Sequence, residues 1–273
     1  MARADDIMLG ASVKGRWDSL ARAAGYLALM QPHHWYTAFM LLALSVFLVA
    51  RHFTPRPPEW AAVPRGHRLA LALAAFVGGA LGAKLPFLFS QSIDFFDGES
   101  WLRAVFRDGK TVVAGLAGAY LAVEATKKIL DIRVKTGDTF ALPLALALAV
   151  GRWGCFLNGC CYGTPTNLPW GVSFRQKDGT WLRCQPTQIY ESLFHFTMAC
   201  VLLEVTRRGA LKRQRLKLYL ICYGVYRFLT EFIRPEETWL LGLTAYQWGA
   251  LALVMGLALQ WRVDRCEPVP AVM

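Results

Sequence analysis

Residues 139–157 read TFALPLALALAVGRWGCFL, an apolar run that contains a single charged residue, Arg152. About 20 predominantly apolar residues are needed to cross the hydrocarbon core of a bilayer as a helix. Lipid offers no water to unpaired backbone groups, so a crossing segment of this kind must be helical. The run therefore predicts a transmembrane helix with an arginine near one end.

Further apolar runs of the same character follow one another along the chain. They cover residues 35–50, 69–89, 112–123, 187–205, 216–232 and 239–261. Hydrophobic residues make up 55% of the chain and charged residues only 18%, against about 25% charged in soluble domains. We therefore expect an all-α polytopic membrane protein of about seven transmembrane helices.

The domain organisation follows from the same runs. Residues 32–263 are expected to form one transmembrane domain, followed by a cytoplasmic tail at residues 264–273. Residues 1–31 carry scattered acidic and basic residues and no compact apolar core, so they do not resemble a secretory signal. Apolar residues spaced around Arg22 favour an amphipathic segment on the membrane surface, although a disordered tail would also fit the sequence.

Lysine and arginine are concentrated in three of the loops between the runs. Four lie in residues 51–68, four in residues 127–135 and six in residues 207–217, whereas the loops between these carry fewer. Loops rich in lysine and arginine stay on the cytoplasmic side. The pattern predicts a multi-pass protein of the bacterial plasma membrane with its N-terminus outside and its C-terminus in the cytoplasm. The net charge of +11 lies in loops and not along one face, which argues against a nucleic-acid partner.

Polar side chains inside the runs gather in the half of each run that this orientation places at the outer face. Ionisable groups within a membrane are costly and by default mark a functional site. Arg227, Glu231 and Arg234 lie at i, i+4 and i+7, so they share one stripe of a helix. The remaining outer polar residues are Tyr36, Lys84, Arg152, Asn158, Gln188, Tyr190 and Glu191. We expect these groups to converge on a site that opens to the outer leaflet.

The charges of this group favour an anionic ligand. Its three arginines outnumber its two carboxylates, although Glu231 could instead belong to an ion-pair network that holds helices together. The planar guanidinium of arginine binds phosphate oxygens in pairs. We therefore expect the headgroup of a membrane phospholipid to bind there.

Residues 151–174 read GRWGCFLNGCCYGTPTNLPWGVSF and begin as the end of a helix. Gly159, Gly163, Pro165 and Pro169 then interrupt the helical pattern. Irregular backbone at membrane depth survives only where it lines protein or water. This segment, with Gly163 inside it, is therefore expected to form a wall of the site.

The cysteines near this segment allow three interpretations. Cys184 could form a disulfide with Cys160 or Cys161, since disulfides persist outside the cytoplasm. A thiol close to Arg152 could instead be reactive, and Cys160 is the best candidate, or the thiols could simply pack. No CxxC pair or Cys/His quartet occurs, so the sequence predicts no metal site and no cofactor.

Four motifs occur in a fixed order: HWY at 34–36, GRxGxFxNGxxxG at 151–163, PTQxYE at 186–191 and RFxxEFxR at 227–234. Together they resemble the prolipoprotein diacylglyceryl transferase family over most of the chain. The resemblance implies a seven-helix membrane fold with its N-terminus outside. It also implies that a diacylglyceryl group passes from phosphatidylglycerol to the thiol of a lipobox cysteine in a prolipoprotein, with release of glycerol phosphate.

The resemblance also implies roles for individual residues. Arg152 and Arg227 would hold the phospholipid headgroup and stabilise the departing phosphate. The residues supporting them would be Glu231, Arg234 and Tyr36. A nearby base would remove the thiol proton of the acceptor.

Three positions depart from the family pattern. Cys155 and Cys160 stand where the family has Asn and Glu, and Val113 stands where it has a functional His. Val113 cannot accept a proton, so Glu231 or Glu191 is the best remaining base, unless Cys160 acts as a covalent nucleophile. The departures are also compatible with a different thiol or amine acceptor, with a non-catalytic lipid-binding or transport protein, and with a protein whose two adjacent cysteines cycle between thiol and disulfide.

Overall fold

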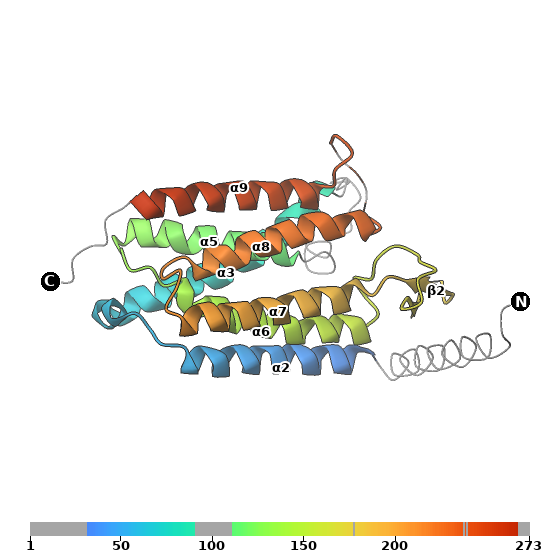
Figure 1. Ribbon diagram of the computed structural model, residues 1–273, viewed down its shortest axis with the longest axis horizontal. Helices are drawn as coiled ribbons and strands as arrows, with labels where there is room; N and C mark the ends of the chain where they lie inside the picture. The colour runs from blue at the N-terminus through green and yellow to red at the C-terminus, as the bar shows by residue number, and fades with distance from the viewer. Residues whose placement is uncertain (1–31, 91–110, 177, 237, 239, 267–273) are drawn as a thin grey trace, which may run out of the picture. The chain divides into compact units, whose positions relative to one another are not determined.

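The computed structural model describes residues 32–90, 111–176, 178–236, 238 and 240–266, and it is almost entirely helical (Figure 1). Each apolar run overlaps a helix in the described residues. The helices are α2 (Pro32–Phe53), α3 (Arg65–Ser90), α5 (Val112–Ile129), α6 (Asp138–Leu157), α7 (Thr187–Arg207), α8 (Arg215–Thr230) and α9 (Ala245–Cys266), with short 3-10 turns η1 (Pro58–Ala62) and η2 (Glu231–Ile233). The predicted surface segment at 1–31 lies outside the described residues.

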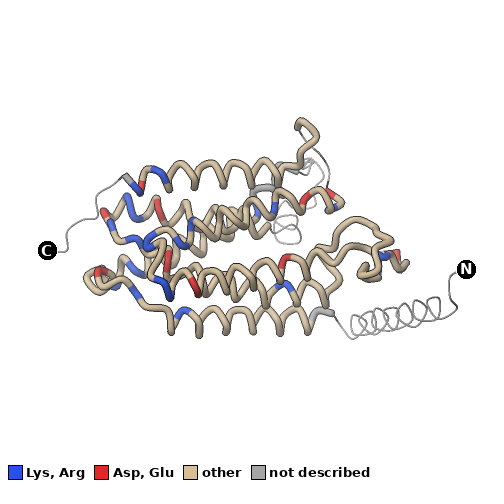
Figure 2. The backbone as a smooth tube through the Cα atoms, in the orientation of Figure 1, with Lys and Arg blue, Asp and Glu red and all other residues tan. Residues whose placement is uncertain are grey.

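Among the helices that the structure describes, four are long and apolar enough to cross a membrane, so the seven spans predicted from the sequence stay a prediction. These four helices contain the segments His34–Phe53, Arg65–Lys84, Asp138–Leu157 and Thr187–Arg207. Large apolar side chains face outward, such as Phe76, which is 75% exposed, and Leu193, which is 59% exposed. Soluble proteins rarely expose so much apolar surface, and lipid accounts for it. Figure 2 shows few charged residues along the middle of the helices, in agreement with a membrane protein.

The described helices fall into two compact units. Unit 1 contains α2, α6 from Leu142 onward, α7 and the short segment Phe232–Pro235. Helix α2 packs on α6 where α6 has small residues: a Cβ atom on Gly154 would lie 3.0 Å from Cβ of Phe39. Helix α7 is joined to α6 by the hydroxyl of Ser192, which donates a hydrogen bond of 2.7 Å to the carbonyl oxygen of Ala149.

A short β-hairpin follows α6 in unit 1, where the sequence predicts no strands. Its strands β1 (Val172–Arg175) and β2 (Trp181–Cys184) are antiparallel, with Val172 opposite Cys184 and Arg175 opposite Trp181. The turn between them contains Gly179 with a φ of 85°, a conformation that glycine adopts without strain. The aromatic rings of Tyr162 and Phe174 stack with their centroids 4.9 Å apart, which joins β1 to the segment that follows α6.

Unit 2 contains α3, α5, α8 and α9. Helices α3 and α5 approach closely because glycines face each other. A Cβ atom on Gly118 would overlap the carbonyl oxygen of Gly78 and lie 2.9 Å from Cα of Gly82. Gly78 and Gly82 form the GxxxG spacing that lets membrane helices pack with their backbones in contact.

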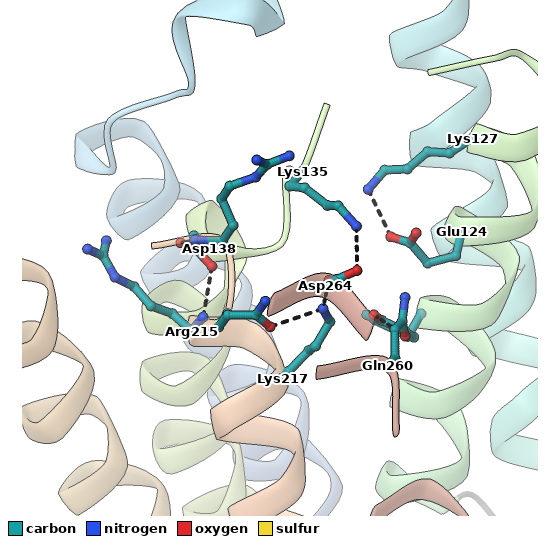
Figure 3. Close-up of polar contacts among 11 residues, drawn as sticks. Glu124, Lys127, Lys135, Asp138, Arg215, Lys217, Gln260 and Asp264 are labelled. Carbon is teal, nitrogen blue, oxygen red and sulfur yellow. Dashed lines mark hydrogen bonds and ion pairs between the residues drawn. The ribbon is translucent and has the colours of Figure 1, made fainter. Parts of the chain in front are cut away.

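Charged residues form a cluster at one end of unit 2 (Figure 3). Asp264 of α9 accepts hydrogen bonds from Lys217 and, at 2.8 Å, from Lys135. Asp138 accepts hydrogen bonds from the backbone N–H groups of Arg213 and Arg215, at 2.5 and 2.8 Å. These contacts tie the first turns of α6 and α8 and the last turn of α9 together.

Helix α9 begins later than the predicted run at 239–261. The side chain of Gln247 accepts the backbone N–H of Thr244, and the Thr244 hydroxyl accepts the backbone N–H of Gln247. This reciprocal pair is a capping box and fixes the start of the helix at Ala245. The helix continues to Cys266, so the first residues of the predicted tail at 264–273 are helical.

Candidate functional site

A buried ion pair joins α6 to α7 in unit 1. Nη2 of Arg152 lies 2.5 Å from Oε1 of Glu191, and the two residues are 9% and 2% exposed. His195, one turn further along α7, places its Nε2 3.8 Å from the same carboxylate oxygen. Two charges removed from water need this close pairing to offset the loss of hydration. The pair thus fixes the guanidinium of Arg152 in position.

The chain reverses sharply at the end of α6. The backbone N–H of Cys160 donates to the carbonyl of Cys155, and that of Gly159 donates to the carbonyl of Phe156, both at 3.1 Å. With Gly159 at a φ of 64°, this is the Schellman motif that ends many helices. The motif folds Cys160 back over the last turn of α6, directly beside Cys155.

Three thiols meet at this turn. The Sγ atoms of Cys155, Cys160 and Cys161 all lie within 4.8 Å of one another. Cys155 and Cys160 are half-buried, whereas Cys161 is exposed. The spacing of these cysteines matches no familiar metal-binding motif, so this convergence could not be read from the sequence.

The environment of Cys161 favours a thiolate. Hydrogen bonds from the thiols of Cys155 and Cys160 hold the pKa of Cys161 below its ordinary value. The positive charges of Arg152 and Arg234 act on this pKa in the same direction. Cys161 is therefore a second candidate for a reactive thiol beside Cys160, which the sequence singles out.

The disulfide predicted for Cys184 is absent from the described part of the chain. Cys184 is a free thiol and is completely buried at the end of β2, opposite Val172. Cys161, by contrast, is exposed on the turn after α6. The hairpin, whose formation the sequence does not reveal, holds Cys184 in its interior.

The first turn of α7 supports the turn that carries the cysteines. The Thr187 hydroxyl donates a hydrogen bond of 2.6 Å to the carbonyl of Cys161. The Gln188 side-chain amide donates one of 2.6 Å to the carbonyl of Cys160. Gln188, predicted to contact substrate, therefore positions the backbone that carries two of the three thiols.

Tyr190 and Gly163, both predicted at the site, have structural contacts in unit 1. The hydroxyl of Tyr190 accepts a hydrogen bond of 2.7 Å from the indole of Trp170. Gly163 lies where three backbone segments cross: a Cβ atom there would lie 2.5 Å from the carbonyl oxygen of Ile233 and 2.8 Å from Cγ2 of Thr187. Only glycine fits at position 163.

Further predicted residues surround the thiols. Asn158 makes a side-chain hydrogen bond to Cys160. The phenol of Tyr36 and the guanidinium of Arg234 are both close enough for electrostatic interaction with the thiols. Unit 1 thus brings together most of the predicted site residues: Tyr36, Arg152, Asn158, Cys160, Gly163, Gln188, Tyr190, Glu191 and Arg234. Sequence reasoning placed Cys155 at the site only as a departure from the family pattern, and it missed Cys161 and Thr187, although Asn158–Gly159 indicated the turn.

The remaining predicted residues lie in unit 2, where Lys84 belongs to α3 and Arg227 and Glu231 form a pair. Nη2 of Arg227 lies 2.8 Å from Oε2 of Glu231, which is 2% exposed. The hydroxyl of Thr244 donates a hydrogen bond of 3.3 Å to the second carboxylate oxygen of Glu231. Val113, at the position of the family histidine, is buried in the first turn of α5.

The comparisons with known proteins agree with the motifs. The family model for prolipoprotein diacylglyceryl transferase matches residues 26–262. The phosphatidylglycerol–prolipoprotein diacylglyceryl transferase of Clostridium tetani is 36% identical over 174 residues, which are 62% of this chain and 69% of that protein. The protein of the same name from Coxiella burnetii is 30% identical over 245 residues, which are 84% of this chain and 90% of that protein. The family match includes every predicted site residue, and the chain belongs to the prolipoprotein diacylglyceryl transferase family.

Proposed function

We propose that this membrane protein transfers a diacylglyceryl group from phosphatidylglycerol to a thiol acceptor at the outer face of the bacterial plasma membrane. Relatives named phosphatidylglycerol–prolipoprotein diacylglyceryl transferase support the donor and the reaction. The structural observation that carries the proposal is the fixed guanidinium of Arg152, held by Glu191 beside a cluster of thiols.

The charges of unit 1 support binding of a phosphate headgroup. Its site contains two guanidinium groups, Arg152 and Arg234, and one carboxylate, Glu191. A guanidinium has five N–H donors, more than one carboxylate can occupy, so an ion pair with Glu191 is compatible with a phosphate contact. Such contacts are strong and directional where water is scarce.

The reaction that fits this site is a substitution at carbon. The sulfur of the deprotonated acceptor attacks the glyceryl carbon that carries the phosphate ester. A C–S bond forms, the C–O bond breaks, and its electron pair leaves on the oxygen of glycerol phosphate. Arg152, positioned before the reaction begins, stabilises the charge that develops on this oxygen.

The carboxylates predicted as bases are both engaged by arginines. Glu191 is bound to Arg152, and Glu231 is bound to Arg227 and Thr244. We propose that both carboxylates orient their arginines. Arg227 is proposed as a further phosphate-binding residue in unit 2, to be tested by its own variant.

A transfer assay tests the proposal. Purified protein in detergent is given labelled phosphatidylglycerol and a lipobox peptide with one cysteine. The native chain is expected to form the thioether, and Arg152→Ala to lose at least about 100-fold in rate. Arg152→Lys, which keeps the charge without the planar fork, should recover only part of this loss. Arg208→Ala removes an exposed arginine paired with Glu204 on α7 and is the matched control.

The outcomes separate the competing functions. Lipid bound without any product would favour a non-catalytic lipid-binding protein. Product from an amine-bearing peptide and none from the thiol would favour a different acceptor. Full activity of folded Arg152→Ala would contradict the proposed role of the guanidinium.

Orientation in the membrane needs its own test. Cys161 is exposed and follows a helix predicted to end at the outer face. A membrane-impermeant maleimide added to intact spheroplasts should label a variant that retains Cys161 as its single cysteine. A single cysteine introduced at Lys212, in the predicted cytoplasmic loop, should react only after the membrane is opened. The reverse pattern would overturn the predicted orientation.

A further inference from the structure

The three clustered thiols of unit 1, those of Cys155, Cys160 and Cys161, have no role in the transfer reaction described above. We propose that Cys155, Cys160 and Cys161 bind a zinc ion, and that the fourth position of this ion receives and deprotonates the acceptor thiol. The inference rests on the proposed transfer reaction, because it supplies the step in which the acceptor loses its proton.

The geometry of the thiols suits this ion. Zinc binds thiolate sulfur at about 2.3 Å, so two sulfurs of a tetrahedral site lie about 3.8 Å apart. The Sγ atoms lie within 4.8 Å of one another, which is within about 1 Å of that spacing. Three protein ligands and one open position are the pattern of catalytic zinc sites, whereas structural sites have four protein ligands.

The backbone of this site is held in place from two sides. The Schellman motif sets Cys160 against Cys155. Thr187 and Gln188 hold the carbonyls of Cys161 and Cys160 at 2.6 Å. Contacts of this kind around a metal site orient its ligands, and losing them typically lowers metal affinity about 10- to 100-fold.

The charges around the three thiols and the exposure of Cys161 are also compatible with a bound zinc ion. Three thiolates and one zinc ion carry one net negative charge. The positive charges of Arg152 and Arg234 both act electrostatically on Cys161 and so favour a negatively charged complex there. Cys161 is exposed while Cys155 and Cys160 are half-buried, so the ion is open on the side of Cys161. A second thiol can reach it from there.

The chemistry is balanced without an oxidant or reductant. A thiol that coordinates zinc loses its proton, which passes to water. The bound sulfur then attacks the glyceryl carbon, the C–S bond forms, and glycerol phosphate leaves with the electrons of the broken C–O bond. Zinc keeps its oxidation state throughout. This route needs no base at Val113, where the family histidine is missing.

Metal binding is measured first, and it does not depend on activity. Purified protein is stripped with a chelator and titrated with zinc, and separately with cobalt(II), whose absorption reports tetrahedral thiolate ligands. One equivalent of each is expected. Cys155→Ser, Cys160→Ser and Cys161→Ser should each weaken binding by more than about 100-fold, since each removes a direct ligand. Cys200→Ser on α7, Cys222→Ser on α8 and Cys184→Ser in the hairpin are the controls and should bind as the native chain does.

A cysteine peptide is then added to the cobalt form. The spectrum should shift as a fourth thiolate binds, and a peptide with serine in place of cysteine should leave it unchanged. In the transfer assay, metal removal should abolish product and added zinc should restore it.

Each contrary result has a distinct meaning. Failure to bind zinc or cobalt, or undiminished binding by the Cys155, Cys160 and Cys161 variants together, overturns the site. A cobalt spectrum that ignores the cysteine peptide overturns thiol activation. Full transfer by metal-free protein also overturns it while leaving the proposed function intact. Absence of transfer with any metal, despite a spectral response to the peptide, means instead that the proposed function has failed, and the activation step falls with it.

Discussion

Arg152 and Glu191 face each other across α6 and α7 with 2.5 Å between guanidinium and carboxylate, and both are nearly excluded from water. Glu191→Gln is expected to lower transfer by about 10- to 100-fold, because Arg152 loses the charge that fixes its orientation. Breaking such a buried pair also lowers the free energy of unfolding by about 3 kcal/mol.

The control for this variant lies on the same helix. Glu204→Gln breaks an exposed pair with Arg208 and should change stability by less than about 1 kcal/mol. Rates and thermal unfolding in detergent are measured for both. Native activity in Glu191→Gln would show that the carboxylate does not position Arg152.

Gly163→Ala should destabilise unit 1. The added methyl group would collide with the carbonyl of Ile233 and with Thr187, and overpacking of this kind costs about 1–3 kcal/mol. Gly249→Ala in α9 is the matched control, since a Cβ atom there meets nothing within 4 Å. A thermal midpoint for Gly163→Ala equal to that of Gly249→Ala would contradict the close backbone approach.

The ion pairs of Asp264 should make unit 2 less stable at acid pH than at neutral pH. Burial of Asp264 tends to raise the pKa, but hydrogen bonds from Lys135 and Lys217 outweigh burial and hold the pKa of Asp264 below its ordinary value. The unfolded state therefore binds more protons, and stability rises with pH in this range. The contribution is complete above the ordinary aspartate pKa of about 3.9 and is lost as pH falls through the lower native value.

Asp264→Asn isolates this contribution. The difference in unfolding temperature between the native chain and the variant should be greatest at neutral pH and shrink toward strong acid. Asp131→Asn, at an exposed aspartate near Arg133, is the control and should show little difference at any pH. A constant difference between the native chain and Asp264→Asn across this range would contradict the linkage.

Thr244→Ala should loosen the start of α9. The variant loses the side-chain cap of the helix, worth about 1 kcal/mol, and the hydrogen bond to Glu231. Thr244→Ser keeps the hydroxyl and should restore both stability and activity. Hydrogen exchange of the first turn of α9 reports the cap, and equal protection in the two variants would argue against it.

The helices could be predicted because bilayer crossing imposes long apolar runs. Arg152 and Glu191 could be predicted to lie together because an unpaired charge inside a membrane is costly and is usually paired with an opposite charge. The predicted start of α9 is too early because apolar residues precede the capping box at Thr244. The hairpin could not be predicted because four-residue strands show little alternation.

The thiol cluster shows a different limit of sequence reasoning. The spacing of Cys155, Cys160 and Cys161 along an extended chain or a continuous helix would not bring all three together. Their convergence depends on Gly159 adopting a left-handed conformation, which folds the chain back on α6. It depends equally on Thr187, which is distant in sequence and binds the turn.

Cys161 has a φ of 63°, in the left-handed region where a residue with a β-carbon is disfavoured by about 1–2 kcal/mol. Glycine would occupy this position without that strain. Selection for stability alone would thus replace Cys161 with glycine. With cysteine at this position the turn is less stable, but it carries a third sulfur. The residue at position 161 in a relative therefore indicates whether that relative uses the thiol or only the fold.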